Sequence, residues 1–135
     1  MIFGYLDTKE KTFNMARAGH NPILVYKSAT KKASYVQTSG MALGLVNDDR
    51  FDDNLESMSM KLETGDCILL YTDGYTEAMN RAGELYGEER FQRVVERCGE
   101  IALARLIDEI DTDVQTFTGG IARHDDMTIM GIRVL

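Results

Sequence analysis

The chain has 135 residues, a length that suits one domain; 44% of them are hydrophobic and 27% are charged. This composition is ordinary for a globular protein with a sizeable core, and a single proline argues against long disordered linkers. No segment approaches the roughly 20 apolar residues of a membrane-spanning helix and the amino terminus is unlike a signal peptide, so a cytoplasmic location without a membrane segment is expected.

Charge is divided unevenly along the chain. Residues 1–50 hold seven Lys and Arg against four Asp and Glu, whereas residues 51–135 hold eight against eighteen. This acidic balance argues against nucleic acid as a partner, and acidic side chains gathered in loops would instead attract divalent cations. The two cysteines, Cys67 and Cys98, lack the spacing of a metal site, so buried free thiols are expected.

Alternation of apolar and polar residues predicts several strands in the first half of the chain. A polar turn at 7–11 joins the first two strands into a hairpin. The segment 18–22 then breaks regular pairing, because Pro22 has no amide donor. A packed connection at 39–45 and a hydrophilic loop at 47–54 follow. The predicted strands are 2–6, 12–17, 23–27, 34–37 and 55–62.

An uninterrupted apolar run at 67–71 predicts a strand buried on both faces, and it leads directly into Thr72-Asp73-Gly74. Gly74 would let the backbone turn sharply after the carboxylate, and Thr76 with Glu77 suits the start of a helix. Helical periodicity then predicts two helices, the first capped by Gly99, and a closing strand. This order indicates an α+β fold in which helices cover one face of a largely antiparallel sheet. The predicted elements are helices 86–98 and 101–117 and strand 127–135.

Two acidic segments border strands that would bring them together if the strands were neighbours. Asp73 follows the buried strand, and Asp125-Asp126 precedes the closing strand. Carboxylates on rigid strands suit Mg²⁺ or Mn²⁺, which prefer oxygen ligands and support hydrolysis by an activated water. The alternative is structural: Asp73-Gly74 is an ordinary turn, and Asp125-Asp126 is a solvated strand start.

Three further residues each have a functional and a structural interpretation. His20 suits a general acid, or it hydrogen-bonds within its own loop. His124 suits a residue that orients a ligand carboxylate, or it is an exposed neighbour of Asp125. Arg17 suits a phosphate contact, or it is a solvated strand residue, which is the interpretation favoured here.

Five motifs occur in a fixed order along the chain, at 18–22, 40–45, 65–78, 83–90 and 125–128. In these motifs and their order, the chain resembles metal-dependent protein serine/threonine phosphatases of the PPM (type 2C) family, and most closely their bacterial SpoIIE/RsbU-like branch. The resemblance covers nearly the whole chain.

The resemblance implies an α-β-β-α sandwich and a site for two Mn²⁺ or Mg²⁺ ions. Asp73 matches the family's metal-binding aspartate in its Thr-Asp-Gly motif, and Asp125 matches the aspartate that opens Asp-Asp-x-Thr. Asp126, Gly74 and His124 are candidates for supporting roles around these ligands. The implied reaction is attack of a metal-bridging water on phosphoserine or phosphothreonine. Bacterial members often act on phosphorylated STAS-type anti-anti-sigma proteins, in sigma factor regulation under an attached sensor domain.

One family motif is missing from these residues. Family domains carry an amino-terminal Gly-Asp-x-x-Asp segment whose aspartate bridges both metals, and Asp7 lies in a polar turn rather than in such a motif. Residues 1–135 are therefore expected to be the carboxy-terminal portion of a single phosphatase domain, inactive or impaired alone. Uncovered strand edges and apolar faces would favour self-association.

Two other hypotheses remain open. One is a non-catalytic signalling module that keeps the phosphatase fold in order to bind a partner protein. The other is a purely structural α+β domain with incidental acidic turns, which predicts no saturable Mn²⁺ binding.

Overall fold

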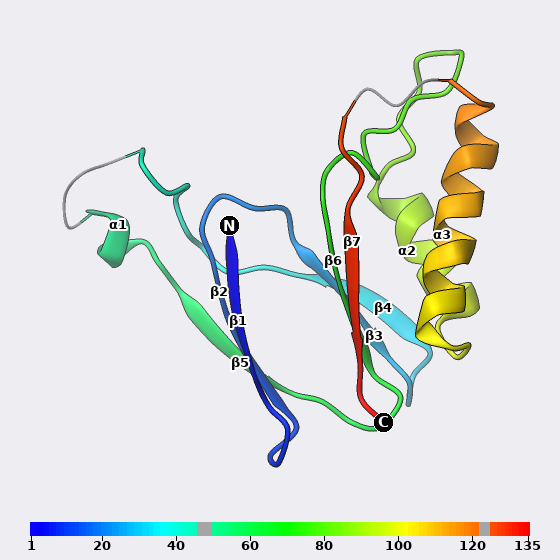
Figure 1. The fold of residues 1–135 in the computed structure, drawn as a ribbon. Helices are drawn as coiled ribbons and strands as arrows, with labels where there is room; N and C mark the ends of the chain where they lie inside the picture. Colours follow the sequence, from blue (N-terminus) through cyan, green and yellow to red (C-terminus); the bar gives the residue numbers. More distant parts are fainter. Residues whose placement is uncertain (46–49, 122–124) are drawn as a thin grey trace.

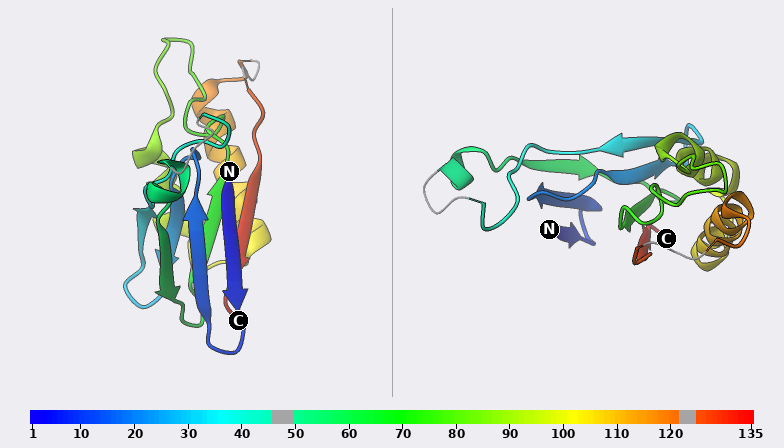
Figure 2. Two further views of the ribbon diagram at one scale, coloured as in Figure 1. Left: turned by 90° about the vertical axis from the view of Figure 1, so that its left-hand side faces the viewer. Right: turned by 90° about the horizontal axis from the view of Figure 1, so that it is seen from above.

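The computed structural model describes residues 1–45, 50–121 and 125–135. In chain order the elements are β1 (Ile2–Asp7), β2 (Thr12–Arg17), β3 (Ile23–Lys27), β4 (Lys32–Val36), α1 (Arg50–Asp53), β5 (Ser57–Lys61), β6 (Cys67–Tyr71), α2 (Glu88–Cys98), α3 (Leu103–Thr118) and β7 (Ile129–Arg133). The strands form two sheets, β1-β2-β5 and β4-β3-β6-β7, in which every pair is antiparallel (Figure 1). The two sheets and the pair α2 and α3 lie in three successive layers (Figure 2). The α+β prediction is therefore confirmed.

The two sheets pack face to face through the alternate residues of their strands. Phe13 and Met15 of β2 point inward and are 3% and 2% exposed, and the register places Met60 and Met58 of β5 beside them. Ile68 of β6 lies in the same cluster from the other sheet. Alternate residues of each strand in the β1-β2-β5 sheet therefore point to a buried face and to an outer face.

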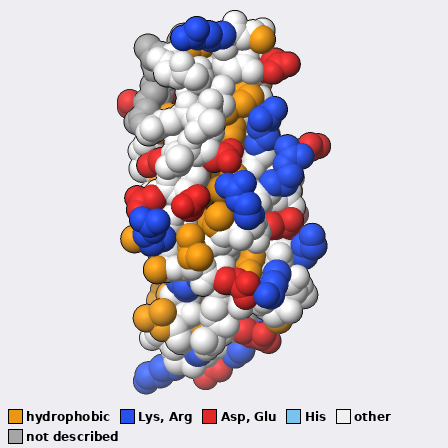
Figure 3. Space-filling model, turned by 90° about the vertical axis from the view of Figure 1, so that its right-hand side faces the viewer, with side chains coloured by type: hydrophobic (Ala, Val, Ile, Leu, Met, Phe, Trp, Pro, Cys, Tyr) orange, Lys and Arg blue, Asp and Glu red, His pale blue; other side chains and the backbone are white. Residues whose placement is uncertain are grey.

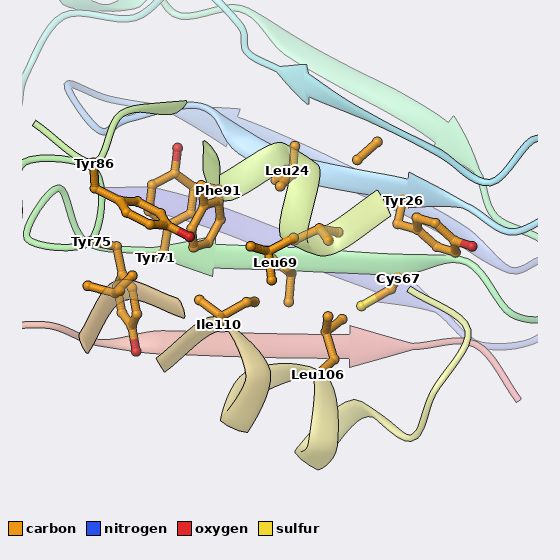
Figure 4. Close-up of a cluster of buried hydrophobic side chains, with 14 residues drawn as sticks. Leu24, Tyr26, Cys67, Leu69, Tyr71, Tyr75, Tyr86, Phe91, Leu106 and Ile110 are labelled. Atoms are coloured by element: carbon orange, nitrogen blue, oxygen red, sulfur yellow. The ribbon is translucent and has the colours of Figure 1, made fainter. Parts of the chain in front are cut away.

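The second core lies between the β4-β3-β6-β7 sheet and the two long helices (Figure 4). Leu69 of β6 and Phe91 of α2 are fully buried there, and the Phe91 ring centroid lies 4.6 Å from that of Tyr71. Leu106, Ile110 and Val114 recur at four-residue spacing on the buried side of α3. Because β6 faces both cores, its continuous apolar sequence is explained.

A buried carboxylate fixes the turn that leads into β6. Asp66 is 1% exposed and accepts hydrogen bonds from Lys27 Nζ (2.6 Å), the Ser28 amide (2.9 Å) and the Glu63 amide (3.0 Å). Burial alone would raise the pKa of Asp66, but these donors outweigh burial and lower that pKa. The turn is thereby held in place beside the start of β6.

The structure differs from the sequence-based expectations at three places. Residues 50–53 form the short helix α1 within the expected loop, whose residues 47–49 lie outside the described part. No helix begins at Thr76 or Glu77, because the chain instead pairs Met79 with Leu85 in a β-bridge before α2 starts. Gly99 is not needed for a left-handed cap, since its φ is −63°. It is needed for space: a Cβ there would meet the Tyr26 ring.

Other boundary differences are small. β4 begins two residues before the predicted 34–37, β5 covers the middle of 55–62, and β7 the middle of 127–135. Among the helices of the described ranges, none is long and apolar enough to cross a membrane.

The outer faces of the layers differ in character. The face formed by α2 and α3 carries interspersed acidic and basic side chains (Figure 3), as expected for a solvated helix surface. On the β1 strand, by contrast, Phe3 and Tyr5 are 68% and 59% exposed. They lie on the side of the sheet opposite its core.

Candidate metal site

The ends of β6 and β7 that carry the acidic residues are neighbours. Tyr71, the last residue of β6, is the register partner of Ile129, the first of β7. Beyond this pair, the Thr72 amide donates to the Thr128 carbonyl (3.0 Å), and the Thr128 amide donates to Thr72 Oγ1 (2.9 Å). The Thr72 hydroxyl donates in turn to the Asp126 carbonyl (2.7 Å). The two acidic segments are thus joined through one threonine.

Gly74 allows the closest approach between the two segments. A Cβ on this buried glycine would lie 2.5 Å from the carbonyl oxygen of Asp126 and 3.3 Å from Met127 Cγ. The sequence suggested that Gly74 serves a sharp turn. Its φ lies outside the left-handed region, so the requirement for glycine here is steric.

The backbone around Asp73 forms a tight turn. Its carbonyl accepts hydrogen bonds from the Glu77 amide (2.8 Å) and Thr76 Oγ1 (3.2 Å), while its side chain is exposed. Asp125 is exposed as well, and one of its carboxylate oxygens accepts from the Asp126 amide (2.7 Å).

The acidic ends of β6 and β7, called here the β6–β7 edge, carry the type of ligand that a hard cation prefers but, among the described residues, too few ligands to hold it. Asp73 and Asp125 supply exposed carboxylate oxygens, the ligands that Mg²⁺ and Mn²⁺ prefer, and such ions keep several waters. Within residues 1–45, 50–121 and 125–135, however, no group of three or more His, Cys, Asp or Glu side chains is placed to hold an ion. His124, a predicted neighbour of the site, lies outside the described residues. These carboxylates thus suit part of a ligand set.

A cavity of about 830 Å³ opens beside this edge. Gly74 and Asp125 belong to its lining, together with residues of the Met79–Leu85 hairpin and of the carboxy-terminal half of α3. No local sequence pattern indicates this cavity, because its described lining residues come from four separate segments of the chain.

The loop at 18–22 reaches the same edge by a contact that the sequence did not indicate. Asn21 Nδ2 donates to the Tyr71 carbonyl (3.0 Å), which ties the loop to the end of β6. His20 Nδ1 lies 3.1 Å from the Asn21 carbonyl, in agreement with the structural interpretation of that histidine. The prediction that Arg17 is a solvated strand residue is wrong. Its guanidinium is half-buried and donates hydrogen bonds to the carbonyls of Thr38 and His20. It stabilises the loop.

Comparison with known proteins decides the family. The family model of Stage II sporulation protein E (SpoIIE) matches residues 1–135. The chain belongs to the SpoIIE family. It is also 24% identical over 133 residues to the phosphoserine phosphatase RsbU of Bacillus subtilis, a match that covers 98% of this chain and 38% of RsbU.

Solved structures agree with this assignment. The RsbU and RsbW domains of Rv1364c from Mycobacterium tuberculosis match with a TM-score of 0.72 at 28% identity, covering 98% of this chain and 35% of that one. The phosphatase domain of SpoIIE from Bacillus subtilis, described as presoaked with Mn, matches with a TM-score of 0.74 at 19% identity. That match covers 99% of this chain and 56% of the other, and it supports the fold alone. The resemblance to SpoIIE/RsbU-like PPM domains is thus confirmed, and the chain spans 38% of RsbU and 56% of this solved SpoIIE chain.

Proposed function

We propose that the chain is part of a metal-dependent phosphatase that hydrolyses phosphoserine or phosphothreonine in a signalling protein. The observation that carries the proposal is the hydrogen-bonded junction of β6 and β7, where Thr72 joins the Asp73 turn to the Asp125-Asp126 segment. Membership of the SpoIIE family supplies the reaction class.

In this proposal Asp73 and Asp125 hold Mn²⁺ or Mg²⁺. The ion, when bound, would neutralise charge on a phosphoryl group and make a nearby water more acidic. Thr72 fixes the spacing of the two carboxylate-bearing segments, and Gly74 lets them approach. The Asp126 amide orients the Asp125 carboxylate through the hydrogen bond between them.

The remaining ligands would come from outside residues 1–135. We propose that these residues are the carboxy-terminal portion of a longer phosphatase domain and that alone they are inactive or impaired. The match to 56% of the solved SpoIIE phosphatase chain supports this, as does the small number of carboxylates at the edge within the described residues.

The proposed substrate is a phosphorylated protein of the STAS-type anti-anti-sigma class, in the cytoplasm. The similarity to RsbU and to the RsbU domain of Rv1364c supports a pathway of this kind. Cys67 and Cys98 are both free, which suits a reducing compartment.

The test compares the chain with its Asp73→Asn variant in two measurements. Mn²⁺ binding by calorimetry is expected to be weak but saturable in the unmodified chain and lost in the variant, because the amide removes a negatively charged ligand. Hydrolysis of p-nitrophenyl phosphate, measured with the chain inside a longer gene product, should depend on Mn²⁺ and fall in the same variant. Asp108→Asn, an exposed substitution on α3, is the matched control and should change neither. Equal Mn²⁺ binding by Asp73→Asn and the unmodified chain would refute the role of Asp73.

A second candidate function is a protein-binding module that keeps the fold without catalysis. The observation in its favour is the incomplete ligand set at the edge of the described structure. It predicts no Mn²⁺-dependent hydrolysis even when the chain is tested within a longer gene product.

A further inference from the structure

The cavity beside the candidate metal site has a size and lining suited to more than a phosphate. Its volume of about 830 Å³ falls in the range of about 300–1,000 Å³ that is typical of ligand pockets. Met79 and Leu85, paired across the hairpin, are 37% and 54% exposed, and with Ile121 they give the cavity an apolar part. A phosphoryl group alone would not use such a surface.

The charged residues in the described lining of the cavity are all acidic. Glu77, Asp111 and Asp125 belong to the described lining, and the lining residues of the described ranges include no lysine or arginine. Asp111 is held in place by the hydroxyl of Tyr75, which donates to its Oδ1 at 2.7 Å. The proposed function assigns Asp125 to the metal, so a cationic group would find the carboxylates of Glu77 and Asp111 beside apolar side chains in this cavity.

The cavity is continuous with the candidate metal site, because Gly74 and Asp125 belong to both. A protein segment whose phosphorylated residue lay at the β6–β7 edge would place its neighbouring residues against the hairpin and α3. From this continuity, the apolar lining and the acidic charge, we infer that the cavity binds the substrate segment that flanks the phosphorylated residue. The segment it fits carries an apolar side chain next to a lysine or arginine. This inference rests on the proposed function.

The methionines allow this to be tested without catalysis. Met79 and Met127 line the cavity, whereas Met58 and Met60 lie in the core between the sheets. In the chain labelled with ¹³C at its methionine methyl groups, the first pair reports on the cavity and the second pair serves as an internal control. The probe is a twelve-residue phosphothreonine peptide with leucine and lysine beside the phosphorylated residue.

We expect saturable shifts of the Met79 and Met127 methyl signals with this peptide and unchanged Met58 and Met60 signals. Exchanging the leucine of the peptide for serine, or its lysine for glutamate, should weaken binding about tenfold. In the protein, Leu85→Ser should weaken binding of the original peptide to a similar degree. Leu43→Ser is the matched control, since Leu43 is 53% exposed and lies outside the cavity lining, and it should have no effect.

The outcomes separate this inference from the proposed phosphatase activity. Selective shifts, without any Mn²⁺-dependent hydrolysis when the chain is tested inside a longer gene product, would support the peptide site and count against the activity. Two results together would overturn the peptide site alone: Mn²⁺-dependent hydrolysis of p-nitrophenyl phosphate, and Met79 and Met127 signals that either do not shift with the peptides or shift equally with all of them. Shifts of these two signals that follow protein concentration in the absence of peptide would identify a second copy as the occupant and also overturn it.

Discussion

Gly74→Ala should weaken both the fold and the candidate metal site. The new Cβ would lie 2.5 Å from the Asp126 carbonyl oxygen, whereas ordinary contacts begin at 3.4 Å. The Asp73 turn and the Asp125-Asp126 segment would have to separate by about 1 Å, against backbone rather than a flexible side chain. Overpacking of this kind costs about 1–3 kcal/mol of unfolding free energy. That cost corresponds to a fall of about 3–12 °C in Tm for a domain of this size.

The measurements are thermal unfolding by circular dichroism without metal, and Mn²⁺ binding by calorimetry. Misplacing a group that positions a ligand typically weakens metal affinity about tenfold or more, and we expect that loss here. Gly131→Ala in β7 is the control, because its Cβ would meet the end of the Leu103 side chain, which can rotate away. It should lose less stability and keep its Mn²⁺ affinity. A Gly74→Ala protein that melts within about 1 °C of the unmodified chain would refute the steric argument.

Three further predictions concern stability, thiols and association. Asp66→Ala should lower the free energy of unfolding by about 2–4 kcal/mol at neutral pH, because it leaves buried donors without an acceptor. The folded pKa of Asp66 lies below its ordinary value of 3.8, so its contribution to the free energy of unfolding is fully present above pH 3.8 and is lost as the pH falls through the folded pKa. The free energies of unfolding of the two proteins should therefore converge in acid. With a thiol-specific reagent, the half-buried Cys98 should react first and Cys67 only on unfolding. Burial keeps the reagent from the Cys67 thiol and raises its pKa. Equal reaction rates of the two thiols would contradict the buried position of Cys67. The chain should self-associate in light scattering, and Phe3→Ser with Tyr5→Ser should reduce this; a monomer at high concentration would rule it out.

Much of the fold could be predicted because local patterns determine it. β6 forms at the predicted residues, because an apolar run of this short length between turn residues is typical of a strand buried on both faces. α3 was placed within two residues, because its apolar positions recur with helical period. The segment after Gly74 was misjudged, since Thr76 and Glu77 have a helix-start composition while the hairpin pairing of Met79 with Leu85 overrides it.

The candidate site was predicted in part for a different reason. That Asp73 and Asp125 border strands could be read from sequence, but that these strands are neighbours is a property of topology. The steric role of Gly74 and the bond from Asn21 to β6 depend on contacts between distant segments, which no local pattern reports. The assignment of the two carboxylates to a metal stays a prediction.

The two carboxylates are 52 residues apart in the sequence, and both α2 and α3 lie between them. An ion that bound both would therefore act as a removable cross-link closing that long loop, and it would bind the folded chain in preference to the unfolded one. At a concentration one hundred times the Kd, such an ion would add about 2.7 kcal/mol to the free energy of unfolding. By reciprocity, substitutions that loosen the packing of α2 and α3 should weaken Mn²⁺ binding without touching a ligand. The helical layer would then help to set the metal occupancy at the ends of β6 and β7, the strands that it covers.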